Sequence, residues 1–310
     1  MRNSKLSAIL LLAFIKVNLC LSQQMPALPP NQLVLPETDQ TIPFTWKGDS
    51  ANGRQEPYAA LLIPVTLPGY SKQLYMQFDL GSPYSMFYLN KVRAVVQVQD
   101  TSTRLTNFGF NVGSMPVLAK EMALKRFDTA GLDPRNPTEI IGTLGSDLIE
   151  GRVLTIDYPR RLMVLGMQWP ENMNIPTADL IFARRSILLP ATIRGKKTML
   201  YFDTGSSAFE LLTDKQTSLQ MAAPGAVPAS YPVRSWEKML TANTLLTNDS
   251  IDIAQQKIPI RAVTYMEGVT EQQMNQMMKL GIGGMTGNKL FLHYVLVIDT
   301  RNKKFGLGKH

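Results

Sequence analysis

Two short segments of this chain end in the same way, with an apolar run that leads into an aspartate, a variable residue, a glycine and a serine. The first segment is 75–82, which contains Asp79, and the second is 199–206, which contains Asp203. Each would deliver one carboxylate onto a tight turn at the end of a strand. Two carboxylates that face each other can form an acid/base pair that activates water. The two aspartates are therefore the first candidates for catalysis.

The elements around the two aspartates belong to an internal duplication. Three further stretches recur in the same order in both halves, namely 62–69 with 188–195, 142–148 with 284–290, and 153–157 with 295–299. The offset is 126 for the first of these pairs and 142 for the other two. The second copy therefore carries extra residues between its aspartate and its glycine-containing turn, and we expect an insertion into a middle loop or hairpin there.

Most of the chain has the pattern of β-strands. From about residue 58 onward, short apolar runs rich in β-branched residues alternate with Gly, Pro and Asn, which is typical of strands and hairpins. The best helical signal covers residues 270–279. Because each copy repeats the order hairpin, aspartate turn, variable middle, glycine turn and closing strands, we predict an all-β fold with two similar lobes.

The motifs resemble those of the aspartic peptidases. Besides the two Asp-x-Gly-Ser turns, Ile140-Ile141-Gly142 and residues 281–284 resemble the hydrophobic-hydrophobic-Gly element that passes the catalytic loop in that family. The compact halves look closer to retropepsin-like lobes fused in tandem than to larger pepsins. The resemblance implies two β-barrel lobes with an active-site cleft between them, in which Asp79 and Asp203 share a proton and hold the attacking water.

The resemblance also implies supporting roles around the aspartates. The glycines would let the backbone pack closely, the serines would interact with the outer carboxyl oxygens, and the threonine would brace its loop against the other lobe. These residues are Gly81, Ser82, Thr204, Gly205 and Ser206. Leu80 departs from the family pattern, because a Thr or Ser usually stands there and leucine has no hydroxyl for a reciprocal bond between the lobes. For the flap that would close over substrate, the candidate is 108–113, which offers no tyrosine for the family role.

The domain boundaries follow from the leader, the repeat and its join. Arg2 and Lys5 precede an apolar run, and small residues near Ser22 are typical of a cleavage site, so we expect a signal peptide and an exported protein. Cys20 could instead carry a lipid, but the large Leu19 before it disfavours this. The expected segments are a signal peptide at 1–22, an extended N-terminal segment at 23–53, an N-terminal lobe at 54–166, a linker at 167–183 and a C-terminal lobe at 184–310.

Composition excludes several other kinds of chemistry. Cys20 is the only cysteine and lies in the leader, while the only histidines are His293 and His310, so thiolate sites, a Ser-His-Asp triad and a multi-histidine zinc site lack their residues. We expect neither a metal nor a cofactor. The formal charge of +8 is spread over scattered basic pairs, which disfavours nucleic-acid binding, and no apolar run is long enough to span a membrane. We expect a monomer that binds a polypeptide.

Three functions remain open from the sequence. The first is an exported aspartic endopeptidase that acts on an extended polypeptide bound between the lobes. The second is a catalytically silent relative that binds a peptide or another ligand in the same cleft, as the loss of a hydroxyl at Leu80 would favour. The third is a structural or envelope-associated β-protein in which the aspartate loops only hold the lobes together. Carboxyls of Asp79 and Asp203 within hydrogen-bonding range would favour the first two.

Overall fold

The computed structural model describes residues 9–10, 28–51, 54–127, 130–171, 173–235, 238–268 and 281–309. Most of the expected signal peptide and the expected helix at 270–279 lie outside these ranges, so both stay predictions. None of the helices within the ranges is long and apolar enough to cross a membrane.

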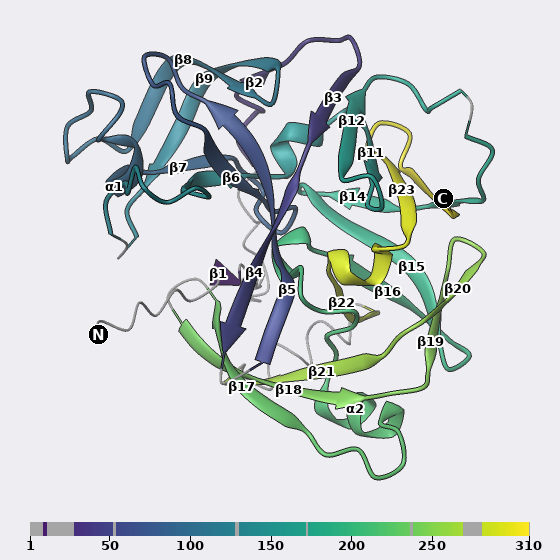
Figure 1. The fold of residues 1–310 in the computed structure, drawn as a ribbon. Helices are drawn as coiled ribbons and strands as arrows, with labels where there is room; N and C mark the ends of the chain where they lie inside the picture. The colour runs from purple at the N-terminus through teal and green to yellow at the C-terminus, as the bar shows by residue number, and fades with distance from the viewer. Residues whose placement is uncertain are drawn as a thin grey trace, which may run out of the picture.

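The chain folds into two lobes whose regular structure is mainly strands, which confirms the all-β, two-lobed prediction (Figure 1). In the described part of the first lobe, one eight-stranded sheet has the order β2-β9-β7-β10-β6-β5-β4, with β8 paired to β5 and β9. Its strands are β2 (Leu33–Val34), β4 (Thr45–Ala51), β5 (Arg54–Thr66), β6 (Leu74–Phe78), β7 (Met86–Tyr88), β8 (Arg104–Val112), β9 (Met115–Lys125) and β10 (Ile140–Leu144). The short helices α1 (Leu89–Val92) and η1 (Ser146–Ile149) follow β7 and β10.

The second lobe repeats this plan with two described sheets. The larger consists of β14 (Ile181–Ala183), β15 (Ser186–Ile193), β16 (Lys196–Phe202), β19 (Ser250–Ile253), β20 (Gln256–Pro259) and β22 (Ile282–Thr286). The smaller has the order β1-β17-β18-β21 and consists of β1 (Ile9–Leu10), β17 (Ala229–Ser235), β18 (Lys238–Leu246) and β21 (Ala262–Glu267). The helices are η2 (Thr204–Ser206), α2 (Lys215–Met221) and η3 (Asn288–Phe291).

A fourth sheet joins the lobes. It runs β13-β24-β23-β11-β12-β3 and consists of β3 (Gln40–Pro43), β11 (Val153–Asp157), β12 (Leu162–Gly166), β13 (Thr177–Asp179), β23 (Tyr294–Asp299) and β24 (Lys304–Lys309). At its centre the closing strands of the two copies pair antiparallel, with Val153 opposite Asp299 and Asp157 opposite Val295. This register maps onto itself when the copies are exchanged, as a pseudo-twofold arrangement requires.

The segments outside the repeat also contribute strands. β2, β3 and β4 come from residues 23–53, where we expected only an extended lead-in, and β13 and β14 come from the join between the lobes. β3 pairs with β12, and β4 pairs with β5. Short edge strands of this kind have little periodicity of their own, because distant partners in the chain stabilise them.

The extra residues of the second copy lie in the hairpin of β17 and β18. Helix α2 begins 126 positions after α1, so the offset is unchanged at that point. Further along, Val112 pairs with Val65 in the first copy and Ile253 pairs with Ala191 in the second. These equivalent residues, Val112 and Ile253, are 141 positions apart. The insertion therefore falls between α2 and β19. β18 pairs with β21 much as β8 pairs with β9, and within the described ranges the first lobe has no strand corresponding to β17.

The proposed flap at 108–113 lies in the wrong place to cover the aspartates, so that prediction is wrong. It forms the end of β8, which pairs with Val65 and Thr66 of β5. Those residues lie opposite the start of β6, whereas Asp79 follows the end of β6. The hairpin turn at Gly113 instead approaches Ile42. Glycines and aromatic residues gave the motif the composition of a flap, but strand pairing directs it toward the far end of the lobe.

A buried hydrogen bond between the copies gives a first testable prediction. Tyr158 Oη donates to Asn288 Oδ1 at 2.8 Å, and both side chains are buried. Tyr158→Phe should lower the free energy of unfolding by about 1–3 kcal/mol, because the amide oxygen loses its donor without gaining water. Urea unfolding would measure this, with Tyr70→Phe at a half-buried site as the control. Equal losses in the two variants would contradict the prediction.

Candidate active site

The two aspartates occupy equivalent backbone positions at the ends of β6 and β16. Asp79 N donates to Leu144 O at 2.9 Å, and Asp203 N donates to Thr286 O at 3.0 Å. In both lobes the acceptor ends a strand, β10 or β22, that runs parallel to the aspartate-bearing strand. The later glycine-containing elements of the repeat therefore fix where each aspartate turn begins.

Glycine is required where these parallel strands thread through the lobes. A Cβ on Gly142 would lie 2.4 Å from Met86 O, and a Cβ on Gly284 would lie 2.5 Å from Leu212 O. Backbone oxygens cannot move aside as a flexible side chain can, so both positions exclude any larger residue. This explains why the glycines recur at the same place in both copies.

Each aspartate turn donates hydrogen bonds to its own carboxyl. Asp79 Oδ1 accepts from Gly81 N at 2.9 Å and from Ser82 N at 3.2 Å. Asp203 Oδ1 accepts from Gly205 N at 2.8 Å, and its Oδ2 accepts from Ser206 Oγ at 2.9 Å.

Ser82 departs from the expectation for a supporting serine. Its hydroxyl donates to Tyr84 O at 2.8 Å, so only its backbone amide contacts Asp79. The expected pair of serine hydroxyls on the outer carboxyl oxygens is therefore formed only by Ser206. Local backbone geometry gives the Ser82 hydroxyl a nearby carbonyl two residues ahead, which competes with the carboxyl.

The carboxyls face each other across the two lobes. A Cβ on Gly81 would lie 2.5 Å from Asp203 Oδ1, and a Cβ on Gly205 would lie 2.5 Å from Asp79 Oδ1. Each carboxyl thus occupies the space beside the glycine of the opposite turn. Both aspartates have an exposed fraction of 0%.

Burial and mutual repulsion make this pair hold a proton. Burial raises the pKa of Asp79 well above its usual value, and the charge of Asp203 and a hydrogen bond between the two side chains raise it further. Burial also raises the pKa of Asp203, to about 6, although hydrogen bonds from Ser206 and Asp79 oppose the rise. Asp79 Oδ2 accepts no hydrogen bond from an N–H or O–H group of the described residues. A proton on Asp79 that is donated to Asp203 accounts for these observations together.

Thr204 braces the two turns from one side only. Its hydroxyl accepts from Leu80 N at 2.8 Å and donates to Phe78 O at 3.0 Å, which joins the second-lobe turn to the first-lobe strand. Leu80 is fully buried and packs into the main apolar core. The contact between the turns is therefore asymmetric, as expected. On the second-lobe side the Thr204 hydroxyl forms hydrogen bonds to the first lobe, whereas on the first-lobe side Leu80 contributes only apolar packing.

Sequence reasoning missed three residues that support the turns. Asn288 Nδ2 donates to Thr204 O at 3.0 Å, and Tyr201 Oη donates to Gly81 O at 3.5 Å. Arg185 is buried and pairs with Glu150 at 2.7 Å while its guanidinium lies 5.2 Å from the Tyr84 ring. The positions of Asn288 and Tyr201 in the repeat were visible, but the partner of Tyr201 lies in the other copy and that of Asn288 lies 84 positions away in its own copy.

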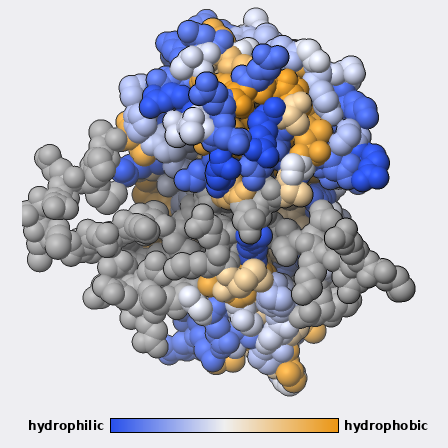
Figure 2. All heavy atoms as spheres, turned by 90° about the vertical axis from the view of Figure 1, so that its left-hand side faces the viewer, coloured by the Kyte–Doolittle hydropathy of each residue, from blue (hydrophilic) through white to orange (hydrophobic). Residues whose placement is uncertain are grey.

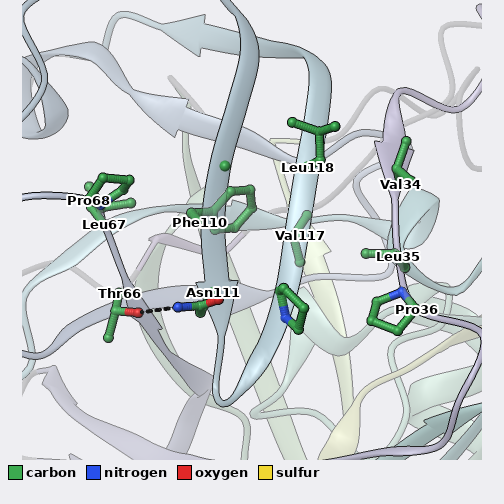
Figure 3. A pocket seen from close by; sticks show the side chains of 12 residues that line it. Val34, Leu35, Pro36, Thr66, Leu67, Pro68, Phe110, Asn111, Val117 and Leu118 are labelled. Atoms are coloured by element: carbon green, nitrogen blue, oxygen red, sulfur yellow. Dashed lines mark hydrogen bonds between the residues drawn. The ribbon is translucent and has the colours of Figure 1, made fainter.

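Other surfaces offer less for chemistry. Within the described ranges no three His, Cys, Asp or Glu residues cluster as metal ligands would. An open groove of about 720 Å³ lies on the surface of the first lobe (Figure 3). Within its lining, Asn111 Nδ2 donates to Thr66 Oγ1 at 3.2 Å. Its lining is mainly apolar and contains no carboxylate. On the face in Figure 2, hydrophilic residues surround a smaller apolar region of the upper lobe.

The raised carboxyl pKa values predict how stability changes with pH. Above about pH 4 the folded chain keeps protons that the unfolded chain has released, so the free energy of unfolding should fall as pH rises toward 6. Asp203→Asn should make this fall shallower, because it removes one titrating group and the charge that opposes ionisation of Asp79. Chemical denaturation at several pH values would measure the slope.

The control for this measurement is Asp252→Asn, at an exposed position of β19. It should keep the slope of the unaltered chain. Burial also raises the pKa of Asp147, to about 6. Asp147 therefore adds to the fall in the free energy of unfolding with pH, and it does so in the unaltered chain and in both variants. A slope that is unchanged in Asp203→Asn would contradict the assignment of the proton to the aspartate pair.

Comparisons with known proteins agree with this architecture. No protein-family model and no curated protein matches the chain. Among solved structures, an aspartic proteinase from Irpex lacteus is similar with a TM-score of 0.51 and 12% identity, covering 88% of this chain and 97% of its own. Basic 7S globulin from soybean is similar with a TM-score of 0.50 and 11% identity, covering 88% and 95%. The chain therefore has the two-lobed fold of the pepsin-like aspartic peptidases.

Proposed function

We propose that this chain is an exported aspartic endopeptidase. The observation that carries the proposal is the pair of buried carboxyls, Asp79 and Asp203, which face each other across the two turns. Burial raises the pKa of both, which favours a proton held between them. A fold alone does not define an activity, and one of the two similar structures is a proteinase while the other is a globulin. The proposal therefore rests on the chemistry of the pair.

The hydrogen bonds around the two carboxyls favour one division of the roles. Asp203, ionised and stabilised by Gly205 N and Ser206 Oγ, accepts a proton from the attacking water. Asp79 donates its proton to the oxygen of the scissile carbonyl, and the water oxygen bonds to the carbonyl carbon. The tetrahedral intermediate then breaks its C–N bond as Asp203 gives its proton to the leaving nitrogen, and Asp79 regains a proton from one hydroxyl of the intermediate as the carboxylic acid product forms. No covalent enzyme intermediate forms.

Access to the pair is part of the same proposal. Neither aspartate is exposed to solvent, so the proposal requires that a bound peptide gain access to their carboxyls. Export would follow from the leader, with removal of residues 1–22. The mature chain is the form that should be assayed.

The direct test compares the mature chain with Asp203→Asn on an unbiased peptide mixture from acid to neutral pH. Mass spectrometry should find internal cleavage by the unaltered chain and a loss of about 100-fold or more in the variant, since general acid–base groups contribute this much. Asp252→Asn, a change of the same kind at an exposed position, should cleave normally. Cleavage that survives in Asp203→Asn would exclude the pair as catalytic.

A second candidate is a silent relative that binds peptides in the same place. The one-sided bracing by Thr204 beside Leu80 favours it, because catalysis is sensitive to small displacements of reacting groups. A peptide whose central amide is replaced by a hydroxyl-bearing isostere would distinguish the two functions. Binding of this peptide without cleavage of its amide counterpart would support the silent relative.

A further inference from the structure

The strand before each aspartate has two faces. One face of β6 carries Met76 and Phe78 into the main core, and the corresponding face of β16 carries Leu200 and Phe202. The opposite faces carry Gln77 and Tyr201, each two residues before its aspartate. Tyr201 reaches Gly81 O in the other lobe, so this second face points toward the aspartate turns.

Strand pairing places equivalent triplets on these second faces. In the second lobe Tyr201 lies between Leu188 of β15 and Met285 of β22. In the first lobe Gln77 lies between Leu62 of β5 and Thr143 of β10. The two triplets occupy the same register in the duplication, and each lies beside the strand end that carries an aspartate. We call them the walls of the two lobes.

The wall of the second lobe is apolar. Tyr201 and Met285 belong to an apolar cluster separate from the main core, with partly buried Leu188 packed against it. The cluster's other buried members are Phe209, Leu212, Leu240, Ala242 and Ile282. Leu240 and Ala242 come from β18, so the inserted hairpin contributes directly to this wall.

The wall of the first lobe is polar at the same positions. Gln77 and Thr143 replace Tyr201 and Met285, and Thr143 Oγ1 shares a hydrogen bond with Tyr88 Oη at 2.7 Å. The charge of Asp79 adds to the rise that burial causes in the pKa of Tyr88, which places this wall within electrostatic reach of the aspartate. Gln77 is 3% exposed, and its Nε2 has no hydrogen-bond partner among the described residues.

We propose that Gln77 is a specificity residue whose unpaired amide donor binds an acceptor oxygen of a peptide side chain, while a large apolar residue on the other side of the central bond packs against the Tyr201 wall. The inference rests on the proposed binding of peptides between the lobes. It defines the ligand as a peptide with an apolar residue next to an amide- or hydroxyl-bearing one. An apolar residue facing Gln77 would leave the buried donor unpaired. The cost of that unpaired donor discriminates between peptides more strongly than apolar packing against the other wall does.

The test uses four peptides with a non-hydrolysable reduced amide at the centre. Phe stands on one side of that bond and either Asn or Leu on the other, in both orders. In one order, the unaltered chain should bind the Asn peptide about 10-fold or more tightly than the Leu peptide, which one satisfied buried donor can supply. Titration calorimetry would measure both affinities.

Gln77→Leu should reverse this ratio, because the donor is replaced by an apolar group. Gln73→Leu is the matched control, since Gln73 Nε2 already donates to Val65 O at 3.0 Å and its side chain is exposed. If Gln77→Leu does not fold, Gln77→Met removes the same donor with an unbranched side chain. Equal binding of the Asn and Leu peptides by the unaltered chain, in both orders, would overturn the inference without any variant.

The outcome also separates this inference from the peptidase proposal. Selective binding without cleavage of the corresponding amide peptides would retain the role of Gln77 and reject the catalytic function. Cleavage with no preference between Asn and Leu would retain the catalytic function and reject the role of Gln77. Failure to bind any of the four peptides would reject the specificity role.

Discussion

Gly205→Ala is expected to reduce peptide cleavage by about 100-fold or more. The added Cβ would lie 2.5 Å from Asp79 Oδ1 and 2.6 Å from its carboxyl carbon, closer than any stable contact. The Asp79 carboxyl or the second-lobe turn must therefore shift, and a displacement of about 1 Å can cost this much in rate. The rate of cleavage and the pH dependence of unfolding would be measured together. The shift should also weaken the hydrogen bond between the two carboxyls and so change their pKa values.

Gly109→Ala is the matched control for this experiment. Gly109 lies on β8, and a Cβ there would have no heavy atom within 4 Å outside its own chain neighbours. This variant should keep the activity of the unaltered chain. Normal cleavage by Gly205→Ala would show that the two carboxyls do not need their observed spacing.

Thr204→Val is expected to cause a large loss of stability for a substitution that changes the side chain so little. Valine keeps the shape of threonine but leaves Leu80 N without its acceptor and Phe78 O without its donor. Each buried group left unpaired costs about 1–3 kcal/mol in the free energy of unfolding. Urea unfolding would measure the loss, and cleavage should also fall because the turns lose the two hydrogen bonds of the Thr204 hydroxyl.

Thr204→Ser separates the hydroxyl from the packing of the side chain. Serine retains both hydrogen bonds and loses only a methyl group, so its stability should remain well above that of the valine variant. If the two variants were equally stable, the contact between the turns would depend on packing rather than on the hydroxyl. Leu80 would then be sufficient on its own to hold the first-lobe turn.

The duplication made much of the fold predictable. Asp79 and Asp203 recur with their glycines in the same order, and backbone crowding at Gly142 and Gly284 allows no other residue, so the constraint is written directly in the sequence. The site of the insertion was visible from the change in offset. Each of these features is repeated within both copies, so comparing the copies reveals it without knowledge of the pairing between them.

The features that were missed depend on pairing between distant segments. The motif at 108–113 has a flap-like composition, but its position is set by its register with β5. The segments 40–43 and 45–51 form strands because they pair with β12 and β5. Likewise, the unlike environments of Gln77 and Tyr201 follow from which face of a strand points away from the core, which the apolar runs around them do not reveal.

The sheet that joins the lobes also determines when the aspartate pair can form. β3 begins at residue 40 and pairs with β12, while β11 pairs with β23, whose residues follow about 140 positions later. Such long-range pairings form slowly, because distant parts of the chain must meet first. The two carboxyls are therefore brought together only once nearly the whole chain has been made and assembled. A partly folded molecule carries two separate aspartates, and it cannot hydrolyse its neighbours or itself by the proposed mechanism.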